Sequence, residues 1–200
     1  MRVLLDTNVI LDVLLNRTPS VTEAKAVWQA HEDGRITGYM TATTMTDIFY
    51  IAHRLTDRAT ARTAVRTCLD TFEICEVNRS VLEQAETLPG NDFEDNVQIT
   101  CANIAGLDAI VTRYTADFRS ATKPVFTPAQ LLIKGGYFTP PGIRNIKKHV
   151  LRRSLSTVAE GKRGLWLPAE APPSKAGLVN TQKTRRVFET LRVFAFAATL

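Results

Sequence analysis

The sequence has no long hydrophobic run and no closely spaced cysteines. None of its apolar stretches approaches the roughly 18 residues that a membrane-spanning helix needs. Its three cysteines lie far apart, without a CxxC pair, which argues against both a disulfide framework and a zinc site. The N-terminus also lacks a basic segment followed by an apolar core and a cleavage site. We therefore expect a cytoplasmic protein with no signal peptide and no membrane span.

Acidic residues are scarce in the last third of the chain. From Thr139 onward there are 12 Lys and Arg but only 3 Asp and Glu, whereas the first 138 residues hold 13 basic and 17 acidic residues. The net charge of +5 therefore comes from the end of the chain. Because the first part is net negative, the basic total does not by itself predict that the folded part binds nucleic acid.

The composition changes at the Thr139-Pro140-Pro141-Gly142 segment. A chain of 200 residues has room for one ordinary domain and an extension. We predict one domain over residues 1–138 and a basic extension, interrupted by Pro and Gly, over residues 139–200. For the extension the sequence leaves four alternatives open: a partly helical RNA-binding arm, a helix that docks on a membrane surface or a partner, a segment without order or role, and a segment that comes from a fusion or a change of reading frame. We favour the last two.

Short apolar segments alternate with helical patterns over the first part of the chain. Strands are expected at residues 2–5, 36–40, 72–77, 109–112 and 125–126, with helices between them. This alternation predicts an α/β protein with three layers, α/β/α, around a central parallel sheet. One of the helices is expected to begin with a capping box from Ser20 to Glu23.

The first expected strand ends abruptly on an acid. Residues 2–5 are followed by Asp6 and then by the polar pair Thr7 and Asn8. In open α/β sheets, functional groups lie just beyond the carboxyl ends of the strands. A carboxylate at the end of a buried strand has little structural reason to be there. Asp6 is therefore the residue around which we expect a site.

Three further carboxylates can reach the same edge of such a sheet. Asp47 is expected on the inner edge of a helix, Asp95 in the first turn of another, and Asp117 just past the fourth strand. Clustered carboxylates repel one another and raise each other's pKa unless a cation neutralises them. Oxygen ligands favour Mg²⁺ or Mn²⁺ over zinc. Such an ion, with water left in its shell, can hydrolyse a phosphodiester.

Each of these acids also has a purely structural alternative. Asp92 could be a helix N-cap, and Asp95 a favourable charge at the positive end of the helix dipole. Asp47 could be one more first-turn acid, and Asp117 an ordinary turn residue. Only the order and spacing of all four acids, with Asp6 first, favour a joint site.

Four motifs carry a resemblance to a known family. They are LLDTNVILD at 4–12, TTMTDIFYIAHR at 43–54, DFEDNVQITCA at 92–102 and AIVTRYTADF at 109–118. With these motifs, residues 1–134 resemble a PIN domain, the metal-dependent nuclease fold common among the toxins of bacterial and archaeal toxin–antitoxin pairs. The last two motifs, in this order and near the domain end, are the more specific.

The resemblance implies an endoribonuclease that cuts RNA with Mg²⁺ or Mn²⁺. It also implies a homodimer and, if the chain is a toxin, a small antitoxin that covers the site. Carried over by motif position, the metal ligands and catalytic acids are Asp6, Asp47, Asp95 and Asp117. The supporting residues are Thr7, Asn8, Asp12, Asp92 and Arg113.

One position departs from the family pattern. After IVTR many members carry Asn or Asp, and here Tyr114 stands in that place. The fourth acidic position is therefore left to Asp117. A core of Asp6, Asp47 and Asp95 would still hold a metal ion, with Asp117 acting through a water.

Two other functions compete with the nuclease. The first is a PIN-fold scaffold that binds RNA or a protein without cutting, which Tyr114 favours. The second is a phosphoacceptor receiver of the flavodoxin-like type, which also clusters acids at a sheet edge. That fold needs a Lys after its fifth strand, whereas the Lys123-Pro124 pair precedes the last expected strand here.

Overall fold

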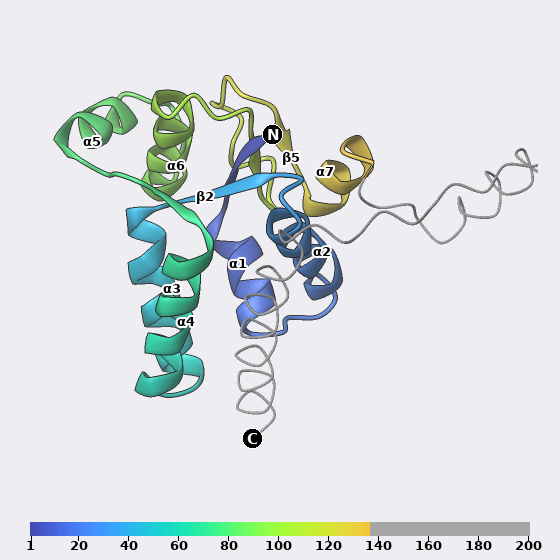
Figure 1. The fold of residues 1–200 in the computed structure, drawn as a ribbon. Helices are drawn as coiled ribbons and strands as arrows, with labels where there is room; N and C mark the ends of the chain where they lie inside the picture. Colours follow the sequence, from blue (N-terminus) through green and yellow to red (C-terminus); the bar gives the residue numbers. More distant parts are fainter. Residues whose placement is uncertain (137–200) are drawn as a thin grey trace, which may run out of the picture.

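The computed structural model describes residues 1–136 (Figure 1). The predicted domain boundary at residue 138 and the whole basic extension lie outside the described residues. Within residues 1–136, no helix is both long and apolar enough to cross a membrane.

Strands and helices alternate along the described chain, as the sequence predicts. The strands are β1 (Arg2–Leu5), β2 (Thr37–Thr41), β3 (Glu73–Cys75), β4 (Ala109–Val111) and β5 (Val125–Phe126). The helices are α1 (Thr7–Leu14), α2 (Val21–Glu32), α3 (Ala42–Leu55), α4 (Arg58–Thr71), α5 (Arg79–Glu86), α6 (Phe93–Ile104) and α7 (Pro128–Lys134).

The five strands form one parallel sheet in the order β3-β2-β1-β4-β5. This order differs from the 2-1-3-4-5 order of flavodoxin-like receivers, so the fold argues against the phosphoacceptor hypothesis. The chain runs outward from β1 to β3 and then returns to the other side of β1 with β4. The place where the direction reverses lies between β1 and β4, and ligands of open α/β sheets bind outside the carboxyl ends of the strands at such a place.

Helices cover both faces of the sheet, which confirms the predicted three-layer α/β/α architecture (Figure 1). On one face, Val3 and Leu5 of β1 share a core with α1, α2, α3, α4 and α7. On the other face, Leu4 and Ile110 pack against α5 and α6. Successive residues of β1 thus point to opposite cores, which is why the strand is apolar throughout.

The predicted capping box at Ser20 and Glu23 is wrong. Ser20 has helical backbone angles, φ −69° and ψ −20°, and its side chain accepts no capping hydrogen bond. An N-cap hydroxyl needs an extended backbone to fold back on the helix, and Ser20 instead continues a turn in which the Val21 N–H donates to the Arg17 carbonyl. Within residues 1–136, a capping box instead forms at Thr127 and Gln130, at the start of α7.

Candidate active site

Asp6 lies at the reversal point of the sheet and is almost completely buried. It follows β1 directly, and its side chain is 5% exposed. The Thr112 hydroxyl donates to its Oδ2 at 2.6 Å, Gln98 Nε2 donates to its Oδ1 at 3.1 Å, and Asn8 Nδ2 donates to Oδ2 as well. Burial raises the pKa of Asp6, and these hydrogen bonds only partly offset that effect. Asp6 is thus a buried carboxyl oriented by three neighbours.

Glu94 is a site residue that the sequence reasoning missed. Its Oε1 accepts from the Thr7 hydroxyl at 2.8 Å and from Gln98 Nε2 at 3.2 Å. Because Gln98 also donates to Asp6, one amide joins the two carboxyl groups. Burial raises the pKa of Glu94, and the charges of Asp47 and Asp6 raise it further.

Asp47 reaches the site from α3. It is half-buried, as the edge position on that helix predicts. Burial raises the pKa of Asp47, while a hydrogen bond with Glu94 lowers it. Asp47 therefore joins the cluster through Glu94, and its charge contributes to the raised pKa of that residue.

Asp95 and Asp117 line a cleft of about 570 Å³ beside this cluster. Burial is the main cause that raises the pKa of Asp95 to about 7, and the charges of Asp6, Asp92, Glu94 and Asp117 add to it. Asp117 is exposed, as a loop acid is expected to be. Asp92 also lines the cleft, but it is the N-cap of α6 and accepts from the Glu94 N–H at 2.8 Å. The cleft thus holds Asp95 between acids that disfavour its ionised form.

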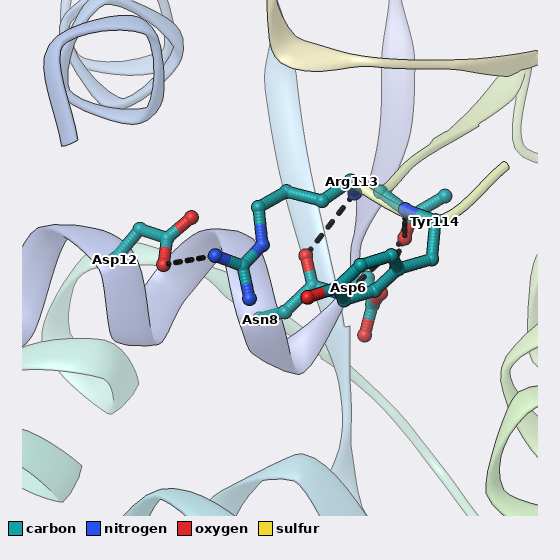
Figure 2. A network of polar contacts seen from close by, with 6 residues as sticks. Asp6, Asn8, Asp12, Arg113 and Tyr114 are labelled. Carbon is teal, nitrogen blue, oxygen red and sulfur yellow. Dashed lines mark hydrogen bonds and ion pairs between the residues drawn. The ribbon is translucent and has the colours of Figure 1, made fainter. Parts of the chain in front are cut away.

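Asp12 and Arg113 form a buried ion pair next to Asp6 (Figure 2). Asp12 is completely buried on α1, and its Oδ1 lies 3.1 Å from Nη1 of Arg113. Burial raises the pKa of Asp12, and the charges of Arg113 and Arg17 lower it less. The Arg113 N–H also donates to Asn8 Oδ1 at 3.2 Å. The residues that follow β4 are thus tied to α1 through both backbone and side chain.

The four predicted acids occupy one region, yet they are not arranged as a finished metal site. Over residues 1–136, no three His, Cys, Asp or Glu side chains converge closely enough to hold one ion. The side chains nevertheless suit a hard divalent cation, because they offer carboxylate oxygens as ligands. Their charges raise the pKa values of Glu94 and Asp95, and a bound cation would offset that repulsion.

Two polar residues of the site could have been found from their spacing. Glu94 and Gln98 are four residues apart and so share one face of α6. Leu5 pairs with Val111 in the register of β1 and β4, which places Asp6 opposite Thr112, the residue after the apolar segment of β4. From the DFED segment the sequence reasoning chose Asp95 as a ligand and Asp92 as a supporting residue but passed over Glu94, and it treated Thr112 as part of a strand.

Comparisons with known proteins identify the family of this chain. The PIN domain family model matches residues 2–116. Among solved structures, "Structure of FitAB bound to IR36 DNA fragment" is 21% identical with a TM-score of 0.50, and the match covers 63% of this chain and 94% of that one. For "Toxin-antitoxin complex from Klebsiella pneumoniae" the identity is 24%, the TM-score 0.48 and the coverage 63% and 97%. "Crystal Structure of FitAcB from Neisseria gonorrhoeae" is 19% identical, with a TM-score of 0.47 and coverage of 64% and 98%.

No curated protein sequence matches this chain. The family match nevertheless spans more than half of its residues and includes both strands that meet at the site. Strands β1 to β4, the reversal between β1 and β4 and the acids Asp6, Asp47, Glu94 and Asp95 lie within the matched range, whereas Asp117 and β5 follow it. This chain belongs to the PIN domain family.

Proposed function

We propose that the chain is a Mg²⁺- or Mn²⁺-dependent endoribonuclease whose site is built around Asp6. The observation that carries the proposal is the crowding of carboxylates at the reversal point of the sheet. There the pKa of Asp95 is raised to about 7 by burial and by the charges of its acidic neighbours. A bound divalent cation relieves this repulsion between the carboxylates. If the acids had only structural roles, nothing would offset the repulsion.

The residues divide into those that hold the ion and those that orient the holders. Asp6, Asp47 and Asp95 are the proposed ligands, with Glu94 as a fourth carboxylate beside them. Asp117 lies on the open side of the cleft and acts through a water. Thr112, Gln98, Asn8 and Thr7 fix the carboxyl groups by the hydrogen bonds described above. When bound, the ion supplies an activated water and offsets charge on the leaving oxygen.

Cleavage of a labelled mixed RNA pool tests this function. We expect cutting with Mg²⁺ or Mn²⁺, none with chelator, and a loss of at least about a hundredfold for Asp95→Asn or Glu94→Gln, because each removes a charged ligand. Asp70→Asn is the matched control, since Asp70 lies on α4 with its side chain 63% exposed. Cutting that survives both site substitutions would show that the activity belongs elsewhere. A folded chain that neither cuts RNA nor binds Mn²⁺ would contradict the proposal.

We also propose that the chain is the toxin of a toxin–antitoxin pair, a role common among PIN domains, and that it acts as a homodimer. A groove of about 830 Å³ between α3 and α4 suits an antitoxin segment. Its apolar lining is Met45, Phe49, Val65 and Leu69, and its basic lining includes Arg58, Arg62 and Arg66. An amphipathic helix with acidic residues along one edge matches both features.

Two measurements address these partners. Arg62→Glu is expected to weaken the capture of a candidate antitoxin by the purified chain. Arg79→Glu, at a side chain of α5 that is 89% exposed and lies outside the groove, is expected to leave the capture unchanged. Equal capture by both variants would remove the groove from the proposal. Sedimentation velocity is expected to give twice the mass of the chain, and a single protomer over the whole concentration range would refute the homodimer.

A second candidate function is an RNA- or protein-binding scaffold that does not cut. One observation favours it: both oxygens of Asp6 already accept hydrogen bonds, from Thr112 and Asn8 on one side and from Gln98 on the other. A scaffold would bind RNA equally well with Mn²⁺ and with chelator. A nuclease would bind Mn²⁺, and substitution of Asp95 would weaken that binding.

A further inference from the structure

Tyr114 presents an exposed aromatic ring next to the acidic cluster. Its side chain is 54% exposed, although it belongs to the loop that directly follows a completely buried strand. No hydrophobic core of the described residues includes this ring. The ring of Tyr114 is therefore not held in place by the hydrophobic core of the described residues.

Two contacts fix the backbone of Tyr114 relative to the site. Its N–H donates to the Thr112 hydroxyl at 3.1 Å, and the same hydroxyl donates to Asp6. Its carbonyl accepts from the N–H of Asp117 at 3.0 Å, so the turn leads directly into the acidic cleft. The backbone of Tyr114 is thus hydrogen-bonded both to Thr112, which contacts Asp6, and to Asp117, which lines the cleft.

The ring itself is supported by Arg113 (Figure 2). The guanidinium carbon lies 5.0 Å from the ring centroid, a cation–π contact. Arg113 is in turn held by the buried Asp12 on α1. The chain Asp12–Arg113–Tyr114 orders an exposed ring in advance, which reduces the entropy lost when a ligand binds.

We propose that Tyr114 is a stacking platform for an unpaired base of the RNA next to the cleaved phosphate. This inference rests on the proposed nuclease function, because the cation that the acidic cluster would hold is what would place the phosphate. A flat ring backed by a cation offers its π-face to any base, so the contact selects single-stranded over paired RNA without reading sequence. In a duplex the base faces are already stacked on their neighbours.

Binding to a short RNA that carries 2-aminopurine tests the platform. The measurements use the full chain in an Asp95→Asn background, in which the proposed nuclease leaves the RNA intact. Tyr114→Leu keeps an apolar side chain but removes the ring, and we expect it to weaken single-strand binding roughly ten- to a hundredfold. It should also abolish the quenching of 2-aminopurine fluorescence. Tyr114→Phe and Tyr114→Trp are expected to stay within about threefold of the parent because they keep a π-face.

Tyr50→Leu is the matched control. Tyr50 is 59% exposed and also carries an arginine on its ring, Arg54 at 5.7 Å, but it lies in the third turn of α3, away from β4. Tyr50→Leu should leave binding and quenching unchanged, and Tyr114→Leu should leave affinity for duplex RNA unchanged.

Several results would overturn the platform. The first is that Tyr114→Leu binds single-stranded RNA as tightly as its parent, and the second is that it loses as much affinity for duplex RNA as for single strands. The third is that Tyr114→Phe loses as much affinity as Tyr114→Leu. The fourth is that the parent does not bind single strands. The outcome is separable from that of the nuclease. RNA cleavage without an effect of Tyr114→Leu would remove only the platform, and stacking without any cleavage by the wild type would remove only the nuclease.

Discussion

At the scale of the residue, the carboxyl of Asp95 has a pKa far above that of an ordinary aspartate. Its pKa is raised from 3.8 to about 7 by burial and by Asp6, Asp92, Glu94 and Asp117. The unfolded chain ionises this carboxyl near pH 4, whereas the folded chain without metal keeps its proton up to near pH 7. The raised pKa of Asp95 therefore contributes fully to the stability of the folded chain below pH 4, and this contribution is lost as the pH rises through 7.

Asp95→Asn is expected to stabilise the metal-free protein in a pH-dependent way. The amide copies the neutral acid, so wild type and variant should have equal unfolding free energies near pH 3.5. The advantage of the variant should grow from about pH 4 and level off above about pH 7. Urea unfolding with chelator at several pH values measures this. An advantage that is constant with pH would mean that Asp95 is not coupled to its acidic neighbours.

At the scale of the element, one ion pair ties the loop after β4 to α1. Asp12 has no hydrogen-bond partner for Oδ2 among the described residues, so its buried charge is compensated mainly by Arg113, with a smaller contribution from Arg17. Arg113→Ala should cost about 3–5 kcal/mol of unfolding free energy, because it leaves a buried carboxyl unpaired. Denaturant titration of the variant measures this loss.

A double variant separates the charge effect from lost packing. Asp12→Leu combined with Arg113→Met removes both charges, so it should lose less stability than Arg113→Ala alone. If the double variant is the less stable of the two, the pair acts through shape and not through charge.

The sheet also depends on a close approach at Gly38 in β2. A Cβ built on Gly38 would lie 2.9 Å from Cδ1 of Phe72 and 3.0 Å from Cδ1 of Leu5. Gly38→Ala should therefore cost roughly 1–3 kcal/mol through overpacking.

Thermal unfolding of Gly38→Ala, with and without Phe72→Leu, checks this contact. The smaller side chain makes room for the methyl group, so the double variant should lose less than the sum of the two single losses. Strictly additive losses would show that Phe72 does not limit the space at Gly38.

At the scale of the whole molecule, the sequence sufficed for the architecture because its parallel strands are short apolar segments bounded by polar residues. All five strands and the helices between them were expected near their observed positions, and the layers follow from that alternation. The strand order did not follow from it, since the order depends on which strands pair across long separations. The capping box at Ser20 failed because the pattern of residues does not fix backbone angles.

The candidate site was predictable only in part. Asp6 stands out because an acid ends a buried strand, and the structure brings Asp47, Asp95 and Asp117 into its region. Glu94 was missed because all three acids of the DFED segment fit a helix N-terminus equally well until β1 and α6 are seen together. The metal-binding roles of these residues, and the division of the chain at residue 138, stay predictions.

A bound cation should stabilise the whole domain. At a Mn²⁺ concentration about a hundred times the dissociation constant, binding adds about 2.7 kcal/mol to the unfolding free energy. For a chain of this size that raises Tm by roughly 5–10 °C. Differential scanning calorimetry at pH 8 should show this rise in the wild type and a much smaller one in Asp95→Asn. An equal rise in both would place the bound ion away from Asp95.

The most direct test of the central claim joins metal occupancy to cleavage in the same samples. Mn²⁺ binding is followed by electron paramagnetic resonance while single-turnover RNA cleavage is measured over the same range of Mn²⁺. The account predicts that both saturate at the same concentration and that Glu94→Gln and Asp95→Asn shift both curves to higher Mn²⁺. Cleavage that proceeds without Mn²⁺ occupancy, or occupancy that neither substitution changes, would contradict a metal-dependent site built around Asp6.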